Sequence, residues 1–217
     1  MKSIIAISVF SLILSSLSAQ ENWDPKINSK LSEVLASHKE FVSIPNLPAD
    51  KQKMYENIDW VKNRYEKVGF QLKKLESSTL PVLFAQRILD PTFKTVLFYF
   101  HLDGQAVNPK MWNQKNPFLP MLKEQKEDGD WRAIPWSSLK GEINDDWRIF
   151  GRAAADDKAP IIMFLSALEL LQKQHQNPKF NIKIIFDLEE EYGSQGFLST
   201  LKKYKEVYRS DYMIIMD

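Results

Sequence analysis

Short runs of almost uninterrupted apolar residues constrain the fold of this 217-residue chain more than any other feature. Three of them are KTVLFYFHLD, FNIKIIFDL and DYMIIMD, over residues 94–103, 180–188 and 211–217. Such runs are typical of strands buried on both faces of a sheet. Weaker strand patterns occupy residues 69–76 and 81–89, and helical patterns occupy residues 24–42, 50–68, 161–174 and 194–203. This alternation predicts an α/β fold with a mixed, mostly parallel sheet and helices on both faces.

Residues 104–146 interrupt the alternation with a long segment that has no clear period and contains several prolines and charged patches. Three of the six tryptophans lie in it, at Trp112, Trp131 and Trp136. Two interpretations remain open for this loop-like segment. Either it shapes a substrate cleft, or it packs on the surface.

The amino terminus, MKSIIAISVFSLILSSLSAQ, has the order of a secretory signal peptide: a lysine, an apolar run and then small residues. The run from Ile4 to Leu17 is shorter than the about 20 residues that a membrane span needs, so an uncleaved anchor is disfavoured. We expect residues 1–19 to be removed by cleavage near Ala19, which predicts a secreted or periplasmic protein without stable membrane insertion.

Composition excludes several kinds of partner and site. The chain has 29 Lys and Arg against 28 Asp and Glu, so its charge gives no reason to expect nucleic acid as a partner. It has no cysteine, which excludes disulfides, thiolate metal ligands and a thiol nucleophile. Any metal must therefore be held by histidine and carboxylates.

Acidic residues follow the apolar runs at the points where the predicted strands end. His101 and Asp103 end the first run, three glutamates (189–191) follow the second, and Asp217 ends the third. Ligands of open α/β sheets bind at the carboxyl ends of the strands. Asp156 and Asp157 precede a predicted helix start, where free backbone N–H groups favour carboxylates. Four segments could thus bring carboxylates and one imidazole to one sheet edge.

A single histidine at a strand end is more often a satisfied polar residue than a ligand, and acidic runs are usually solvated surface. Here, however, apolar residues that should be buried precede the acids, and clustered carboxylates repel one another unless a cation neutralises them. Asp103 can also hold one ring nitrogen of His101, since residues two apart in a strand face the same side. These features favour a metal site.

The motifs in chain order resemble those of a known family. They are His101-x-Asp103, GRAAADDKAP at 151–160, EEYGSQG at 190–196, and Asp217 at the end of an apolar strand. Together they are similar to the dinuclear zinc metallopeptidases and aminoacylases, which include carnosinase-like dipeptidases, acetylornithine deacetylase, succinyl-diaminopimelate desuccinylase, aminoacylase-1 and glutamate carboxypeptidase.

The resemblance implies two divalent metal ions, zinc in the first place, with cobalt or manganese as alternatives. The implied metal ligands are His101, Asp156, Glu191 and Asp217. Asp156 would bridge the two ions, and Glu191 would bind the second. Glu190 would be the general base and acid, and Asp103 would orient His101. A cis peptide bond between Asp156 and Asp157 is also implied.

The activity implied by the resemblance is hydrolysis of an amide bond in small peptides or N-acyl amino acids, with a water activated between two metals. Secretion favours a dipeptidase or carboxypeptidase over a deacylase of N-acyl amino acids, which remains the alternative. The rival interpretations are a non-catalytic secreted binding domain and an inactive fragment of this fold. The resemblance also allows a homodimer of the full-length protein.

The chain departs from the family pattern in three respects. Ala153 and Ala159 stand where glycine is usual, and the segment between Asp103 and Asp156 is long. The histidine that completes the second metal site of the family lies far downstream, beyond an inserted lid or dimerisation domain. We therefore expect residues 20–217 to be the amino-terminal part of a longer catalytic domain, inactive alone.

Other polar residues near the motifs allow simpler interpretations. His38 and His175 fall in a helical pattern and at a helix end, so neither is expected to replace the missing histidine. Arg152 and Lys158 flank Asp156 and could steady it, although a lysine at a helix start is more often solvated. Glu189 has no assigned role and could be a solvated acid.

Overall fold

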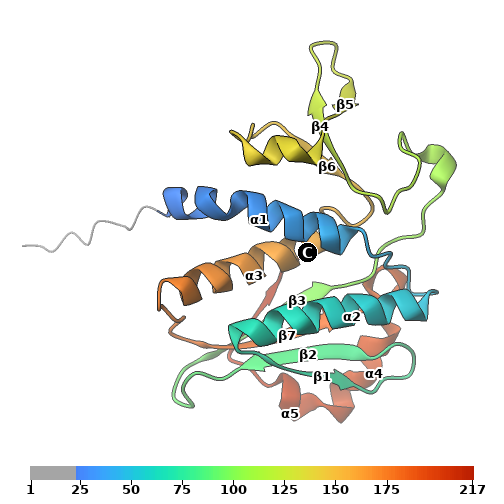
Figure 1. Ribbon diagram of the computed structural model, residues 1–217. Helices are drawn as coiled ribbons and strands as arrows, with labels where there is room; N and C mark the ends of the chain where they lie inside the picture. Colours follow the sequence, from blue (N-terminus) through green and yellow to red (C-terminus); the bar gives the residue numbers. More distant parts are fainter. Residues whose placement is uncertain (1–22) are drawn as a thin grey trace, which may run out of the picture.

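The structure is a computed structural model that describes residues 23–217, so the predicted signal peptide (1–19) lies outside the described residues. A five-stranded sheet in the order β1-β2-β7-β3-β8 forms its centre (Figure 1). The strands are β1 (Gln71–Leu75), β2 (Val82–Arg87), β3 (Thr95–His101), β7 (Asn181–Asp187) and β8 (Tyr212–Ile215). The β3–β7 and β3–β8 pairs are parallel, whereas β1–β2 and β2–β7 are antiparallel. The predicted mixed α/β class is confirmed, with parallel and antiparallel pairs in equal number rather than mostly parallel pairs.

The predicted helices are present, with boundaries close to those expected. The α-helices are α1 (Asp24–Val42), α2 (Lys51–Tyr65), α3 (Lys158–Lys173), α4 (Gln195–Lys203) and α5 (Lys205–Tyr208), and the 3-10 helices are η1 (Glu66–Val68), η2 (Pro109–Met111), η3 (Trp136–Lys140) and η4 (Glu190–Tyr192). The Asp50 side chain caps α2 by accepting the Lys53 N–H at 3.1 Å. Gly69 ends the following turn at φ 86°, a left-handed conformation that glycine adopts readily.

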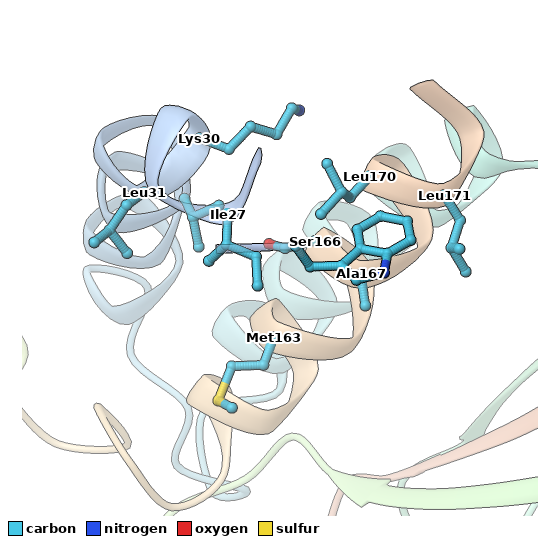
Figure 2. Close-up of a pocket in the computed structure, with 10 residues that line it drawn as sticks. Ile27, Lys30, Leu31, Met163, Ser166, Ala167, Leu170 and Leu171 are labelled. Carbon is cyan, nitrogen blue, oxygen red and sulfur yellow. The ribbon is translucent and has the colours of Figure 1, made fainter. Parts of the chain in front are cut away.

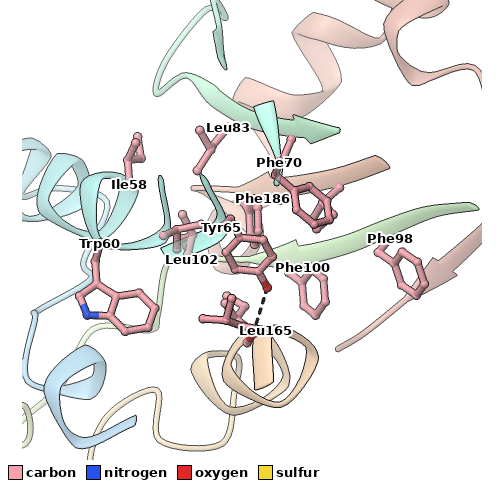
Figure 3. Packing of buried hydrophobic residues seen from close by; sticks show 14 of the residues in the cluster. Ile58, Trp60, Tyr65, Phe70, Leu83, Phe98, Phe100, Leu102, Leu165 and Phe186 are labelled. Atoms are coloured by element: carbon pink, nitrogen blue, oxygen red, sulfur yellow. Dashed lines mark hydrogen bonds between the residues drawn. The ribbon is translucent and has the colours of Figure 1, made fainter. Parts of the chain in front are cut away.

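Helices cover both faces of the main sheet, as the alternating pattern predicted. On one face α2 and α3 enclose a core in which the Tyr65 hydroxyl donates to the Ile161 carbonyl at 3.0 Å (Figure 3). On this face Phe100 and Phe186 stack, with ring centroids 5.7 Å apart. On the other face Phe197 of α4 and residues of α5 pack against apolar side chains of the sheet. The central strands are therefore fixed by burial on both sides.

The segment 104–146 is more ordered than its sequence suggested. It contains the strands β4 (Met121–Gln125) and β5 (Trp131–Ala133), which form a three-stranded antiparallel sheet with β6 (Arg148–Phe150). In Figure 1 this sheet lies above α1. The tryptophans of the segment pack on neighbouring side chains. The Trp131 ring lies 5.1 Å from the Phe150 ring, and the Lys39 ammonium lies 4.7 Å from the Trp136 ring. These contacts support surface packing for this part of the segment.

The last strand differs from expectation in its burial. The apolar side chains of β8, from Tyr212 to Ile215, are 43–64% exposed. The reason is topological, because β8 is an edge strand that pairs only with β3 in the described chain. The prediction that all three apolar runs are buried is therefore wrong for this one.

An apolar pocket of about 590 Å³ lies between α1 and α3 (Figure 2). Its lining includes Ile27, Leu31, Met163, Ala167 and Leu170. None of the acidic residues singled out by the sequence lines it, so it is separate from the candidate site. Across residues 23–217, no helix combines the length and apolar character needed to cross a membrane.

Candidate metal centre

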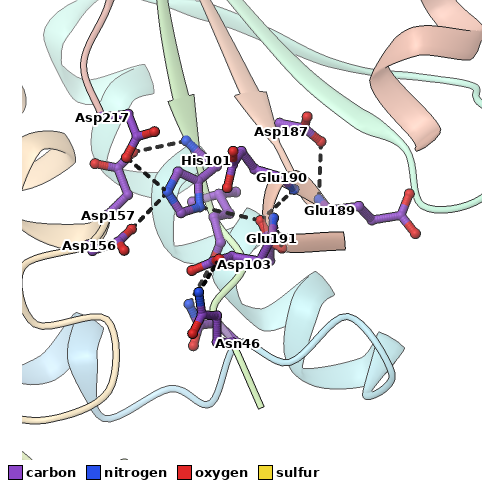
Figure 4. A network of polar contacts seen from close by, with 12 residues as sticks. Asn46, His101, Asp103, Asp156, Asp157, Asp187, Glu189, Glu190, Glu191 and Asp217 are labelled. Atoms are coloured by element: carbon purple, nitrogen blue, oxygen red, sulfur yellow. Dashed lines mark hydrogen bonds and ion pairs between the residues drawn. The ribbon is translucent and has the colours of Figure 1, made fainter. Parts of the chain in front are cut away.

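The acidic residues converge at one edge of the main sheet because β3 lies between β7 and β8 and is parallel to both. His101 is level with Asp187 in the β3–β7 pairing. In the β3–β8 pairing Tyr99 is level with Ile215, so Asp217 follows β8 at the height of His101. Figure 4 shows the side chains of Asp156 and Asp217 beside the His101 ring, whereas Asp187 lies apart from it.

Three of the four predicted ligands come together. The Nε2 atom of His101 lies 2.9 Å from Oδ1 of Asp156 and 3.8 Å from Oδ1 of Asp217. One ligand atom from each residue lies within 4.8 Å of the other two. The His101 side chain is 1% exposed, whereas those of Asp156 and Asp217 are 62% and 49% exposed. The cluster thus has a buried imidazole at its base and two carboxylates at its mouth.

The two ring nitrogens of His101 indicate whether this cluster fits a metal ion. Both ring nitrogens are buried, and neither makes a well-formed hydrogen bond within the described chain. Buried polar atoms are rarely left in this state without a partner such as water or an ion. An imidazole nitrogen and carboxylate oxygens form a ligand set that suits zinc, cobalt or manganese. The residues present therefore fit a divalent cation.

Protonation competes with a cation at this cluster. Burial lowers the pKa of His101, but the carboxylates of Asp103, Asp157 and Asp156 together raise it to about 9. Burial raises the pKa of the Asp157 carboxyl to about 7, against the opposing effect of the His101 N–H and imidazolium. Without a cation, the site therefore holds a proton on His101 at neutral pH, and a cation has to displace it.

Asp103 joins the ends of β3 and β7. Its buried carboxylate accepts the backbone N–H of Glu190 at 3.0 Å and that of Glu191 at 3.1 Å. Its Oδ1 atom also lies 3.4 Å from Nδ1 of His101, the contact that the His-x-Asp spacing predicted. Asp103 therefore holds the backbone of the two glutamates and lies beside the imidazole.

Glu190 and Glu191 begin the 3-10 helix η4 just beyond β7. Glu191 is not part of the cluster around His101, and its Oε2 atom accepts the side-chain N–H of Gln105 at 2.8 Å. The first residues of the 104–146 segment thus reach the site. Burial raises the pKa of Glu190 above its ordinary value, the charge of His101 opposes this shift, and the charges of Asp217 and Glu191 add to it.

Glu189, which the sequence left without a role, has a structural one. Its Oε2 atom accepts the Thr79 hydroxyl, the Leu80 N–H at 3.3 Å and the Gly196 N–H at 3.2 Å. It thereby ties the β1–β2 turn to the start of α4. Gly196 has to be glycine here, because a Cβ atom would lie 2.6 Å from the Leu80 carbonyl oxygen.

The Asp156 segment has the backbone features that its motif suggested. The peptide bond between Asp156 and Asp157 is cis, as the resemblance implied. Ala153, at a usual glycine position, is left-handed at φ 62°, a conformation that glycine adopts more easily. The Asp157 carboxylate accepts the His101 backbone N–H at 2.9 Å. The sequence placed Asp157 at this edge but did not predict the contact, because a buried backbone hydrogen bond leaves no mark in the residue pattern.

Two further residues at the site were missed or misjudged. Asn46 is fully buried, and its side-chain Nδ2 donates to the Leu102 carbonyl at 2.9 Å. Its backbone carbonyl accepts the Gly104 N–H at 3.0 Å. No sequence signal marks it. Lys158 is fully buried rather than solvated. The reason is that it donates to the backbone carbonyls of Phe41 and Ile44, at 2.8 and 2.7 Å.

Comparison with known proteins shows which family has this arrangement of residues. The model of peptidase family M20/M25/M40 matches residues 97–217, more than half of the chain and the whole span from His101 to Asp217. The chain belongs to peptidase family M20/M25/M40. The family resemblance inferred from the four motifs is thus confirmed.

Curated family members share moderate identity with the chain. It is 29% identical over 206 residues to the Cys-Gly metallodipeptidase of Schizosaccharomyces pombe, covering 88% of this chain and 39% of that protein. It is 31% identical over 139 residues to the human Beta-Ala-His dipeptidase, covering 63% of this chain and 23% of that protein. The chain thus spans less than half the length of these relatives.

Solved structures of the family share the fold. Human carnosine dipeptidase 1 superposes with a TM-score of 0.70 at 22% identity, covering 88% of this chain and 39% of that one. The metallo-carboxypeptidase Sso-CP2 of Sulfolobus solfataricus superposes with a TM-score of 0.67 at 25% identity, covering 85% and 37%. The mixed sheet with helices on both faces is therefore the architecture of this family.

Proposed function

We propose that the full-length protein is a metal-dependent dipeptidase that hydrolyses the amide bond of small peptides. The observation that carries this proposal is the convergence of His101, Asp156 and Asp217 within 4.8 Å at a sheet edge where Asp103 also holds the backbone of Glu190. Both curated relatives described above are named as dipeptidases, one for Cys-Gly and one for Beta-Ala-His. Their names support the substrate class, a short peptide.

His101, Asp156 and Asp217 would hold one divalent cation, which would supply Lewis acidity for amide hydrolysis. Glu191 would serve a second cation together with Asp156. In the structure its carboxylate is bonded to Gln105, so ligation requires this hydrogen bond to be exchanged. Zinc suits this ligand set best, and cobalt or manganese could replace it.

Glu190 would carry the proton during hydrolysis. Its carboxylate would take a proton from the attacking water and give it to the departing amine. Burial raises its pKa, which brings it nearer to the working pH and improves both transfers. Asp103 would keep the Glu190 backbone in place through the 3.0 Å hydrogen bond.

The test is Glu190→Gln in the full-length protein, with Cys-Gly, a β-alanyl dipeptide and an N-acetyl amino acid as substrates. Loss of a general base predicts that kcat on the dipeptides falls about 10²–10⁴-fold while the bound cation content stays unchanged. Glu127→Gln is the matched control, since Glu127 is exposed, lies between β4 and β5 of the smaller sheet, and is not part of the cluster. Activity above half of wild type in Glu190→Gln would remove Glu190 from this role, and hydrolysis of the N-acetyl amino acid alone would reassign the substrate class.

A further inference from the structure

We propose that Lys158 is a positioning residue of the metal centre, which holds Asp156 at its ligand position by anchoring the Asp156–Lys158 run to the end of helix α1. The proposal rests on the proposed function, because it assumes that Asp156 binds a cation. It assigns to a buried lysine a role in cation binding without contact to the cation.

Lys158 is the first residue of α3, and its side chain is 0% exposed. Its Nζ atom donates to the Phe41 carbonyl at 2.8 Å and to the Ile44 carbonyl at 2.7 Å, and it lies 4.5 Å from the centre of the Phe41 ring. These carbonyls are at the carboxyl end of α1, where the helix dipole favours a cation. The ammonium group is therefore satisfied by main-chain oxygens and an aromatic face.

Three consecutive side chains attach this run to two elements, His101 of β3 and the end of α1. Asp156 reaches the His101 ring at 2.9 Å, Asp157 accepts the His101 backbone N–H at 2.9 Å, and Lys158 bonds to the end of α1. The Asp156 side chain is 62% exposed, so packing does little to hold it. Its position then depends on the two residues that follow it, of which Asp157 fixes it to β3 and Lys158 fixes it to α1.

The segment that receives Lys158 is itself attached to the other side of the site. Asn46, two residues after Ile44, is bonded on both sides of Asp103, to the Leu102 carbonyl at 2.9 Å and to the Gly104 N–H at 3.0 Å. The Asn57 side chain of α2 also donates to the Pro45 carbonyl at 2.8 Å. Residues 41–46 therefore form one connection between the His101 strand and the Asp156 segment, and Lys158 is its link to the latter.

An apolar side chain of the same length could fill this space but could not hold the segment. Burying an ammonium group is unfavourable unless its donors are satisfied, so packing alone gives no advantage to lysine here. The directional bonds to two carbonyls set the distance between α1 and the start of α3. Removing them should let the Asp156 segment move and weaken the cation site.

Lys183 provides a matched control within the same chain. Its Nζ atom also donates to two backbone carbonyls, those of Val207 at 2.8 Å and Arg209 at 2.7 Å. It lies on β7 and holds the segment before β8, and it is not one of the residues of the His101 cluster. Replacing either lysine by methionine removes the same kind of bridge, but only Lys158 is linked to a ligand.

The test is a titration of cobalt(II) into the 217-residue chain and into its variants Lys158→Met, Lys183→Met and His101→Ala. Visible absorption reports the ligand geometry around cobalt, and far-UV circular dichroism checks that each variant is folded. Loss of an outer positioning contact predicts about 10–100-fold weaker cobalt binding and a changed spectrum in Lys158→Met. Lys183→Met should bind as wild type does, even if its unfolding temperature falls equally.

The outcomes separate the two proposals. Cobalt binding that His101→Ala leaves unchanged would overturn the metal centre and this inference with it. Binding by folded Lys158→Met with wild-type affinity and spectrum would overturn the inference alone. If Lys158→Met does not fold at 25 °C, the same titration of Lys158→Gln at low temperature with sucrose decides the matter, because the shorter amide cannot bridge both carbonyls and must also weaken binding.

Discussion

Substituting Asp103 by asparagine should disturb the site more than the same substitution at Asp187, although both aspartates are buried at the same sheet edge. Both oxygens of Asp103 accept backbone N–H groups, those of Glu190 and Glu191. An asparagine has one acceptor oxygen and one amide nitrogen, so either orientation faces an N–H group with another donor. Hydrogen bonds to a charged group contribute about 1.5–3 kcal/mol each, and losing one while leaving its donor unsatisfied predicts a loss of about 2–3 kcal/mol in the free energy of unfolding.

Asp187 differs because its hydroxyl partners, Tyr99 and Ser194, can reverse their roles. It accepts the Glu189 N–H at 3.0 Å and the Tyr99 hydroxyl at 2.9 Å. A hydroxyl both donates and accepts, so the asparagine amide can donate to it while the asparagine oxygen keeps the N–H. Asp187→Asn should therefore reduce the free energy of unfolding by no more than about 1 kcal/mol.

Urea unfolding of the two variants, followed by circular dichroism at neutral pH, measures the difference. With a urea slope of about 2 kcal/mol per M, Asp103→Asn should lower the unfolding midpoint by about 1–1.5 M, and Asp187→Asn should lower it by no more than about 0.5 M. Equal shifts in the two variants, or a larger shift for Asp187→Asn, would refute the reasoning from donor and acceptor geometry.

Two more predictions follow from the backbone and the charges of the site. Ala153→Gly should raise the free energy of unfolding by about 0.5 kcal/mol, because left-handed backbone is unfavourable for alanine, whereas the neighbouring Ala154→Gly should lower it; calorimetry that shows the same sign for both would contradict this. In the cation-free chain, the folded-state pKa values of Asp157 and His101 are raised to about 7 and about 9. The free energy of unfolding should therefore fall as pH rises from about 4 to 7, where Asp157 loses its proton, and from about 6.5 to 9, where His101 loses its proton. Unfolding measured across this range should therefore show stability falling with pH, and Asp157→Asn should flatten the lower part of the curve; an unchanged slope in that variant would exclude Asp157 as its source.

Several elements could be predicted because their determinants are local. The Asp50 cap and the spacing of apolar residues indicated the start of α2, and Gly69 marked the end of the 3-10 helix η1 that follows it. The long apolar run of β3 indicated a buried central strand, which it is. The parallel arrangement of such strands then implied that His101 and Asp217 would meet at one edge, as the register confirms.

Other features could not be predicted because they depend on contacts between distant segments. The exposure of β8 follows from its place at the sheet edge, which its apolar sequence does not encode. The two strands within 104–146 have weak patterns and are held by pairing with each other and with β6. The role of Glu189 depends on Thr79 and Leu80, more than one hundred positions earlier in the chain.

The sequence by itself determined the order of the helices and strands and the set of ligand-type residues at the strand ends, because periodicity and residue chemistry are properties of short segments. Only the tertiary structure decided the contacts that those residues make. It grouped His101 with Asp156 and Asp217, left Glu191 bonded to Gln105, and buried Lys158 against the end of α1. The physical reason is that each of these placements depends on hydrogen bonds and packing between segments far apart in sequence, which no local pattern records.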